Sequence, residues 1–295
     1  MSDEVRWERM FPDQLEAAFA RWPLLYLPYG LCEPHGPQCT LGLDALKAHA
    51  LCVRAARQAG GIVAPPDYWH IHEVSGYADW AERNVGEVPR TWLTSVPPWQ
   101  HFKNVLYHLR AADAIGFRGV ILLTGHYGPN WQDLKTLLDL VRPHIGATLL
   151  GLPDFEANVP GFDGDGAGGD HAGKVETSLL WALEPACVDV SRLPGGRPGP
   201  TPNFATGESA HQSDRRCGER MADDIARYLA DRGRQLLSDF ESQPKRPRLE
   251  TFAAVETIWR EVVEPALPTF HTMQASWDGR EPSPGSRWRR NWPTG

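Results

Sequence analysis

Glu33-Pro34-His35-Gly36-Pro37-Gln38-Cys39-Thr40-Leu41-Gly42-Leu43-Asp44 is the stretch around which the fold can be predicted. The short apolar run Leu24–Leu27 before it predicts a buried strand, and helical spacing from Leu43 to Val53 predicts a helix after it. Within the loop, Glu33 and His35 are two residues apart and can point toward a common centre. Oxygen and nitrogen donors without a thiolate suit Zn²⁺, Mn²⁺ or Fe²⁺. Taken alone, such a pair is more often ordinary polar surface than a metal site.

The composition indicates a globular protein. The chain has 295 residues, an apolar fraction of 41% and a formal charge of -7, enough length for a large core. The sequence has no long runs of like charge, which disfavours nucleic-acid and membrane-surface partners. The charge does not distinguish an enzyme from a binding protein. A small-molecule ligand is therefore expected.

The cysteines and the N-terminus bear on the cellular compartment. Five scattered cysteines without a C-x-x-C pair do not form the pattern of a disulfide framework or a structural zinc site. The first residues lack the layout of a signal peptide, and no apolar run approaches the roughly 18 residues of a membrane helix. We expect a soluble, cytoplasmic protein.

The order of the predicted elements indicates an α/β fold. Apolar runs at 24–27, 62–64, 119–124 and 147–152 predict strands that alternate with helices, which favours a mostly parallel sheet covered on both faces. Residues 119–124 are continuously apolar, as in a strand buried on both faces, and His126 follows them directly. Ligands of open α/β sheets bind beyond the carboxyl ends of the strands. The loops carrying Glu33 and His126 are therefore expected to meet.

An aromatic segment lies between the second and third predicted strands. Residues 67–98 show no clean periodicity and contain His70, His72 and Trp80 among several other aromatic side chains. A long segment without regular structure is typical of a lid or binding loop. Its aromatic rings could equally pack the segment onto its own domain.

The remaining candidates lie before and after a glycine-rich stretch. Residues 163–170 resemble a calcium loop but lack its spacing and its final glutamate. His171 and Glu176 follow at the start of a predicted helix that extends to about Leu183, where helix capping and dipole pairing are an alternative explanation for both. The helical pattern continues after the connector 191–213, and the chain from about Asp278 shows no core pattern.

Three separated motifs resemble the creatininase family, whose members are also called creatinine amidohydrolases. They are E-x-H-G-P with an aspartate eleven residues after the glutamate, a strand followed by G-H-Y-x-x-N, and D-H-A-G-x-x-E-T-S. The resemblance runs from about residue 22 to 240. It implies a three-layer α/β fold with a mostly parallel central sheet flanked by helices, one or two divalent ions (Zn, Mn or Fe), and often a hexamer. We accordingly expect one metal-hydrolase domain over 1–240, with a C-terminal helix and irregular tail over 241–295.

The same resemblance assigns metal ligands. It places them at Glu33, His35, Asp44 and His126, with Asp44 bridging if two ions bind. In creatininase a further glutamate ligand stands where this chain has Gly128. The resemblance then leaves either a mononuclear site or a substitute carboxylate, for which Glu176 is the candidate, as ligand or as general base.

Catalytic and substrate-binding roles are also implied. His171 matches a family histidine that acts on the substrate or leaving group, and Asp170 could orient it or point away. Creatininase carries a substrate-gripping tryptophan where this chain has Ala167, so creatinine is not the expected substrate. Aromatic walls with a few polar groups are typical of small-molecule pockets, which selects the substrate contacts Tyr127, His70, His72 and Trp80.

The expected function is metal-dependent hydrolysis of a carbon–nitrogen bond other than a peptide bond, in an amide, cyclic amide or formamide. One alternative is hydrolysis of a carbon–carbon bond in a cyclic ketone, as in an inosose-cleaving branch of the family. The other is a non-catalytic, metal-stabilised scaffold whose exposed tail around Trp288 and Trp292 binds a partner. A homo-oligomer is expected from the family resemblance.

Overall fold

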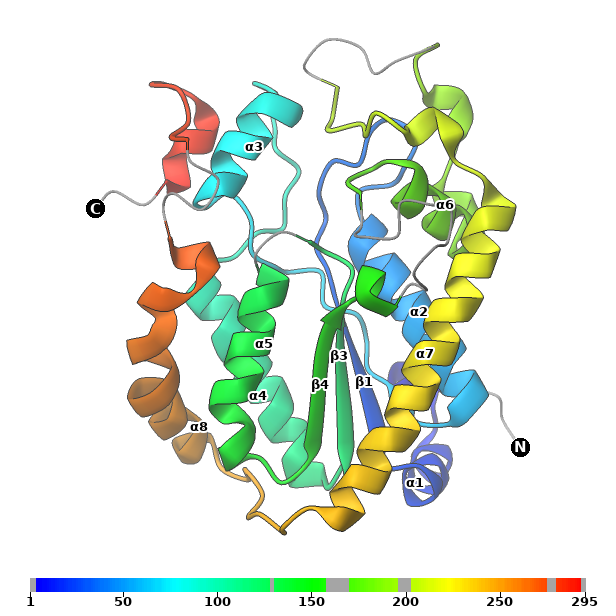
Figure 1. Ribbon diagram of the computed structural model, residues 1–295, viewed down its shortest axis with the longest axis vertical. Helices are drawn as coiled ribbons and strands as arrows, with labels where there is room; N and C mark the ends of the chain where they lie inside the picture. Colours follow the sequence, from blue (N-terminus) through cyan, green and yellow to red (C-terminus); the bar gives the residue numbers. More distant parts are fainter. Residues whose placement is uncertain (1–3, 128–129, 158–169, 196–202, 275–279, 293–295) are drawn as a thin grey trace.

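The computed structural model describes residues 4–127, 130–157, 170–195, 203–274 and 280–292. Within these residues a four-stranded parallel sheet lies at the centre of the molecule (Figure 1). Its strands lie in the order β2-β1-β3-β4 and are β1 (Leu24–Tyr29), β2 (Ile62–Val63), β3 (Gly119–Thr124) and β4 (Thr148–Pro153). The predicted strand at 119–124 coincides with β3, and the other three differ from their predictions by one or two residues at an end.

Helices cover both faces of the sheet. One face is covered by α2 (Leu43–Ala59) and α7 (Arg215–Ser242), onto which α6 (Lys174–Leu183) packs. The other is covered by α1 (Pro12–Arg21), α4 (Pro98–Ile115) and α5 (Asn130–Val141), and α8 (Phe252–Ile258) packs on the outer side of α4. Successive strand residues point to opposite faces, so both sides of each strand are buried. This explains why β1 and β3 are apolar throughout. The predicted three-layer α/β fold is confirmed.

The aromatic segment 67–98 is more regular than predicted. It contains a helix, α3 (Gly76–Asn84), which carries Tyr77 and Trp80. The prediction of a segment without regular structure is therefore wrong for this part. A nine-residue helix offers only two turns of apolar spacing, and its buried face packs against a part of the chain far away in sequence.

That distant part is the predicted irregular tail. The indole of Trp288 is 1% exposed and packs with Ala78, Ala81 and Val85, and its Nε1 donates a hydrogen bond to the Gly86 carbonyl at 3.0 Å. The short 3₁₀ helix Arg287–Asn291 holds it against α3. The expectation of an exposed Trp288 is wrong. Burial of a large aromatic ring is favourable, but a helix this short shows no apolar periodicity from which that burial could be predicted.

Two predicted stretches lie partly outside the described residues: the glycine-rich loop 163–170, apart from Asp170, and residues 196–202 of the connector 191–213. Gly128 and Ala167 also lie outside them. In the described part of the chain, no helix has the length and apolarity that a membrane crossing requires.

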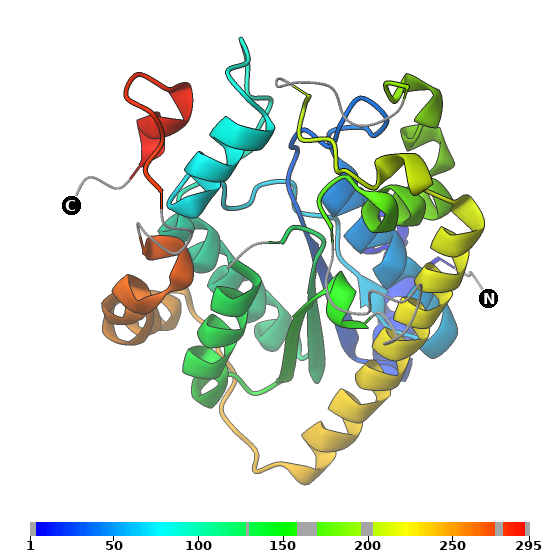
Figure 2. The same cartoon turned by 45° about the horizontal axis from the view of Figure 1, so that its top comes forward.

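The carboxyl ends of the strands bring the candidate residues to one place. The chain leaves β1 toward Glu33, β3 toward His126 and β4 toward Asp154. Figure 2 shows α3 and α6 at this same end of the sheet. The predicted meeting of the loops after β1 and β3 is confirmed.

Candidate metal centre

A cavity of about 230 Å³ lies at the carboxyl ends of the strands. Its lining draws on β-strand loops, α2, α3 and α6, and consists of Glu33, Asp44, His72, Tyr77, Trp80, His126, Tyr127, His171 and Glu176. Most of the residues predicted from sequence are therefore brought together, although they are spread over residues 33–176 of the chain.

Two glycines allow the start of α2 to approach the strand ends. A Cβ atom at Gly30 would lie 2.3 Å from the Ala45 nitrogen, and one at Gly125 would lie 2.2 Å from the Asp44 carbonyl oxygen. Any side chain at either position would push α2 away. The close approach places the Asp44 carboxylate, at the first turn of α2, between the loops after β1 and β3.

The first group of donors combines Glu33, Asp44 and His126. His126 Nδ1 lies 2.9 Å from Glu33 Oε1 and 3.3 Å from Asp44 Oδ2. His126 Nε2 is 3.1 Å from the Ile71 carbonyl, which can only accept, so Nε2 carries the hydrogen of this bond. Nδ1 is thereby left facing two carboxylate oxygens.

The second group combines His35, Asp44 and Glu176. His35 Nε2 lies 3.2 Å from Asp44 Oδ1 and 3.5 Å from Glu176 Oε2. Its Nδ1 is 3.1 Å from the Glu33 carbonyl, so this histidine also gives its other ring hydrogen to the backbone. Asp44 is shared by both groups, with one carboxylate oxygen facing each histidine.

These donors fit divalent metal ions. All five side chains are at most 4% exposed, and each group offers three ligand atoms within 4.8 Å of one another. Among the described residues, His35 Nε2 and both oxygens of Asp44 are buried without a hydrogen bond, which is costly for polar atoms unless another ligand satisfies them. Metal-binding histidines typically donate their second ring N–H to a backbone carbonyl or carboxylate, as both histidines do.

The electrostatics of the site also favour bound cations. Burial opposes charge on both imidazoles, but the carboxylates outweigh it. Asp44, Glu176 and Glu33 raise the pKa of His35 to about 9, and Glu33 and Asp44 raise the pKa of His126 to about 10. The carboxylates thus create a strongly negative potential at the two positions where the lone pairs converge.

His171 lies beside this centre at the mouth of the cavity. Its ring stacks on His35 with centroids 4.3 Å apart, and Trp80 meets it edge-on at 4.7 Å. His171 Nε2 donates to the Pro34 carbonyl at 3.0 Å, leaving Nδ1 4.0 Å from Glu33 Oε1. Burial and the neighbouring charge of His35 lower the pKa of His171 to about 4, so its imidazole is neutral at pH 7.

Asp170 does not contact His171 through a described hydrogen bond. Its two carboxylate oxygens accept from the backbone N–H groups of Val175 and Glu176, at 2.9 and 3.0 Å. Asp170 therefore caps the start of α6, and the idea that it orients His171 is not supported by these contacts.

The predicted substrate contacts divide into three kinds. Trp80 lines the cavity. His72 and Tyr127 line it as well, but His72 Nε2 lies 3.1 Å from Glu33 Oε2 and the Tyr127 hydroxyl donates to Asp154 Oδ1 at 2.6 Å. His70 does not line the cavity, and its ring instead packs on His101 with centroids 3.9 Å apart. The structure therefore places His70 behind the site.

Sequence reasoning missed Lys47 and Asp154, which are both fully buried; Lys47 pairs with Glu176 and with Asp154. Each had a local signal. Lys47 follows Asp44 by three residues, on the same side of α2, where an apolar residue would be expected. Asp154 follows β4 directly, at the same end of the sheet as Glu33 and His126.

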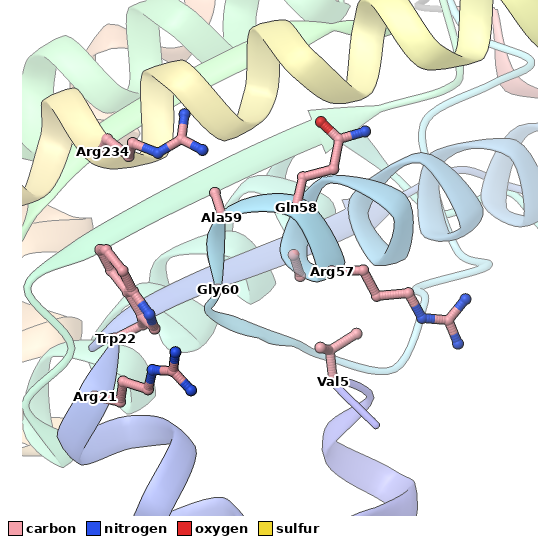
Figure 3. Close-up of a pocket in the computed structure, with 9 residues that line it drawn as sticks. Val5, Arg21, Trp22, Arg57, Gln58, Ala59, Gly60 and Arg234 are labelled. Atoms are coloured by element: carbon pink, nitrogen blue, oxygen red, sulfur yellow. The ribbon is translucent and has the colours of Figure 1, made fainter. Parts of the chain in front are cut away.

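A larger cavity of about 780 Å³ lies at the opposite end of the sheet (Figure 3). Arg21, Arg57 and Arg234 border it with Trp22, and its lining contains no carboxylate or imidazole. Arg21 and Arg57 lie in the last turns of α1 and α2, where basic side chains offset the negative end of the helix dipole. This cavity lacks the donor chemistry of the site at the carboxyl ends.

Comparisons of the whole chain with known proteins point to one family. The family model described as "Creatininase: Creatinine amidohydrolase" matches residues 8–241. A creatinine amidohydrolase from Pseudomonas putida is 28% identical over 200 residues, which are 61% of this chain and 72% of that protein.

Solved creatininase structures share the fold. A mutant creatininase of the Zn-Zn type superposes with a TM-score of 0.62 at 24% identity, covering 79% of this chain and 98% of that one. A structure named as creatininase with Mn gives a TM-score of 0.62 at 23% identity with the same coverage.

Proposed function

This chain belongs to the creatininase family, and we propose that it is a metal-dependent hydrolase that cleaves a carbon–nitrogen bond, other than a peptide bond, in a small molecule. The observation that carries the proposal is the pair of buried donor groups that share Asp44. Such an arrangement is typical of two-metal hydrolytic sites, in which a carboxylate bridges neighbouring ions.

Five side chains are proposed to hold the ions. Glu33, His126 and one oxygen of Asp44 form one site, while His35, Glu176 and the other oxygen of Asp44 form the second. Glu176 thereby takes the place of the family glutamate that is absent at Gly128. The mixed oxygen and nitrogen donors suit Zn²⁺, Mn²⁺ or Fe²⁺, and the names of similar creatininase structures mention Zn and Mn.

Divalent ions bound in such a site make water acidic enough to supply hydroxide near neutral pH and polarise a carbonyl group. Other side chains of the protein orient the proposed ligands. His72, through its contact with Glu33 Oε2, orients that carboxylate so that Oε1 faces the first donor group. Because the ligand atoms are buried, competing bulk water is excluded.

His171 is proposed to transfer a proton to the leaving nitrogen. Its Nε2 is occupied by the Pro34 carbonyl, so Nδ1 is the atom that can accept and return a proton beside Glu33 Oε1. The stacking contact with His35 and the edge contact with Trp80 hold the ring in this orientation. A positioned acid or base of this kind contributes about 10²- to 10⁴-fold to the rate.

The substrate is proposed to be small and partly planar. The cavity measures about 230 Å³, below the usual range for drug-sized ligands. Trp80, Tyr77 and Tyr127 supply aromatic walls. Because Ala167 replaces the substrate-gripping tryptophan of creatininase, creatinine is not the proposed substrate, and a different cyclic amide or a formamide is. The predicted homo-oligomer and cytoplasmic location stay predictions.

The test is a substrate screen with metal-loaded protein. Lactams, hydantoin-type rings and formamides would be compared with cyclic polyol ketones, each with wild type and with His126→Ala. Turnover of an amide that disappears in the variant supports the proposal. Turnover confined to the ketones would instead assign carbon–carbon hydrolysis, and bound metal without turnover of any compound would support a scaffold.

A further inference from the structure

Lys47 brings a buried ammonium group to the site. It is 0% exposed, and its Nζ lies 2.7 Å from Glu176 Oε1, 2.7 Å from the Tyr127 hydroxyl and 3.0 Å from Asp154 Oδ2. Burying an ammonium group is expensive unless it is paired and fully hydrogen-bonded. Lys47 Nζ donates hydrogen bonds to Glu176 and to Tyr127 and forms an ion pair with Asp154, so contacts on three sides hold its ammonium group in place.

Lys47 fixes the orientation of the Glu176 carboxylate. Its Oε1 accepts from Lys47 Nζ, and its Oε2 accepts from the Ala172 backbone N–H at 2.8 Å. A carboxylate anchored at both oxygens cannot rotate about its last bond. Its Oε2 is thereby kept 3.5 Å from His35 Nε2, within the second donor group.

Lys47 is in turn fixed from the sheet. Asp154 stands directly after β4, and the Tyr127 hydroxyl donates to Asp154 Oδ1 at 2.6 Å. The Tyr127 ring also lies under the ammonium group, 4.4 Å from Nζ. The chain of contacts runs from the end of β4 through Asp154 and Lys47 to Glu176.

We infer that Lys47 is a positioning residue, which orients Glu176 as a ligand of the second metal site. This inference rests on the proposed function. Lys47 reaches Glu176 directly, whereas Glu33 and His126 of the first donor group are not among its contacts. The charge of Lys47 also acts on Asp44, which both groups share, so the loss of Lys47 should weaken the second ion more than the first.

If the ion pair between Lys47 and Asp154 contributed only to stability, the variants would behave differently. In that case replacing Lys47 lowers stability, because Asp154 is left buried and unpaired, and both metal sites respond alike. The double variant Lys47→Met/Asp154→Asn removes both charges and so avoids the unpaired aspartate. Lys135→Met is the matched control, since Lys135 pairs with Glu156 at 2.6 Å on a partly exposed surface.

The experiment titrates chelator-stripped protein with Mn²⁺ and measures two binding constants, with thermal unfolding recorded for every variant. Wild type and Lys135→Met should bind two ions. In Lys47→Met and in the double variant, the second ion should bind about 10- to 100-fold more weakly, the usual effect of losing an outer contact to a metal ligand. Adding Lys47→Met to Glu176→Gln should cause little further loss, because the ligand that Lys47 orients is then already absent.

Three results would overturn the inference. They are second-ion binding within twofold of wild type in the double variant, equal weakening of both ions, or failure of both Lys47 variants to fold with or without Mn²⁺. If wild type itself binds no metal, the proposed function fails as well. If wild type binds two ions and the Lys47 variants bind both as tightly as wild type does, the proposed role of Lys47 is refuted and the proposed function is not.

Discussion

His171 stacks on His35 with ring centroids 4.3 Å apart and ring planes inclined by 21°. The contact joins a proposed metal ligand to the side chain proposed to move the proton. Because His171 Nε2 is bound to the Pro34 carbonyl, the ring cannot turn without losing both contacts. The proton-accepting nitrogen is therefore fixed toward the cavity.

Replacing His171 separates metal binding from chemistry. His171→Ala should retain both ions and lose about 10²- to 10⁴-fold in kcat, because a positioned proton donor is lost while the five proposed ligands remain. Metal analysis and steady-state kinetics on one preparation check this. His211→Ala, at an exposed histidine, is the matched control. Turnover within tenfold of wild type would remove His171 from the mechanism.

His126 and His70 are buried neighbours with different expected roles. His126→Ala should abolish binding at the first site, because it removes the only nitrogen in that donor group. His70→Gln should retain both ions, since His70 does not line the cavity. Metal content after gel filtration checks both variants. Loss of metal in His70→Gln, with metal kept in His126→Ala, would reverse the assignment.

Trp288 tests whether the last part of the chain belongs to the folded core. Trp288→Ala should lower the free energy of unfolding by about 3–5 kcal/mol, the usual cost of truncating a buried large aromatic residue. Trp99→Ala should cost far less, because Trp99 is 50% exposed and surface changes are usually within about 0.5 kcal/mol. Equal stability of the two variants, measured by denaturant unfolding, would contradict the packing on α3.

His101 should make the protein sensitive to acid. Burial lowers the pKa of His101 to about 3, below the value of about 6.5 for an unfolded chain. Between these two values the unfolded state binds the extra proton, so the free energy of unfolding falls as pH falls from 6.5, by up to about 1.4 kcal/mol per pH unit. Above pH 6.5 this contribution is fully present.

The comparison with His101→Gln isolates that contribution, because the metal-site histidines are the same in both proteins. Unfolding free energies between pH 4.5 and 7.5 should fall less steeply in the variant than in wild type. The same slope in both proteins would show that His101 is not kept neutral by the fold.

The layers of the fold and the position of the site followed from local sequence. The apolar runs of β1 and β3 are buried on both faces. A parallel strand buried in this way typically has a continuous apolar sequence, so it can be predicted from the local sequence. The rule that ligands bind at the carboxyl ends of the strands then placed Glu33 and His126 together. The roles of Asp44, His171 and Glu176 came from the family resemblance.

The remaining features depend on contacts between distant parts of the chain. Trp288 reaches α3 through a hydrogen bond to Gly86 across 202 residues, and no local pattern contains that information. Lys47 and Glu176 are 129 residues apart. A lysine on the inner side of a helix signals an unusual environment, but its partners are set by the tertiary fold. His70 and His72 looked equivalent in sequence, but in the fold His72 lines the cavity whereas His70 packs on His101.

Metal content per chain, measured side by side on wild type and Glu176→Gln purified without chelator, tests the central claim most directly. Two donor groups that share Asp44, with Glu176 in only one of them, predict two equivalents in wild type and about one in the variant. Two equivalents in both proteins, or none in wild type, would contradict the proposed metal centre.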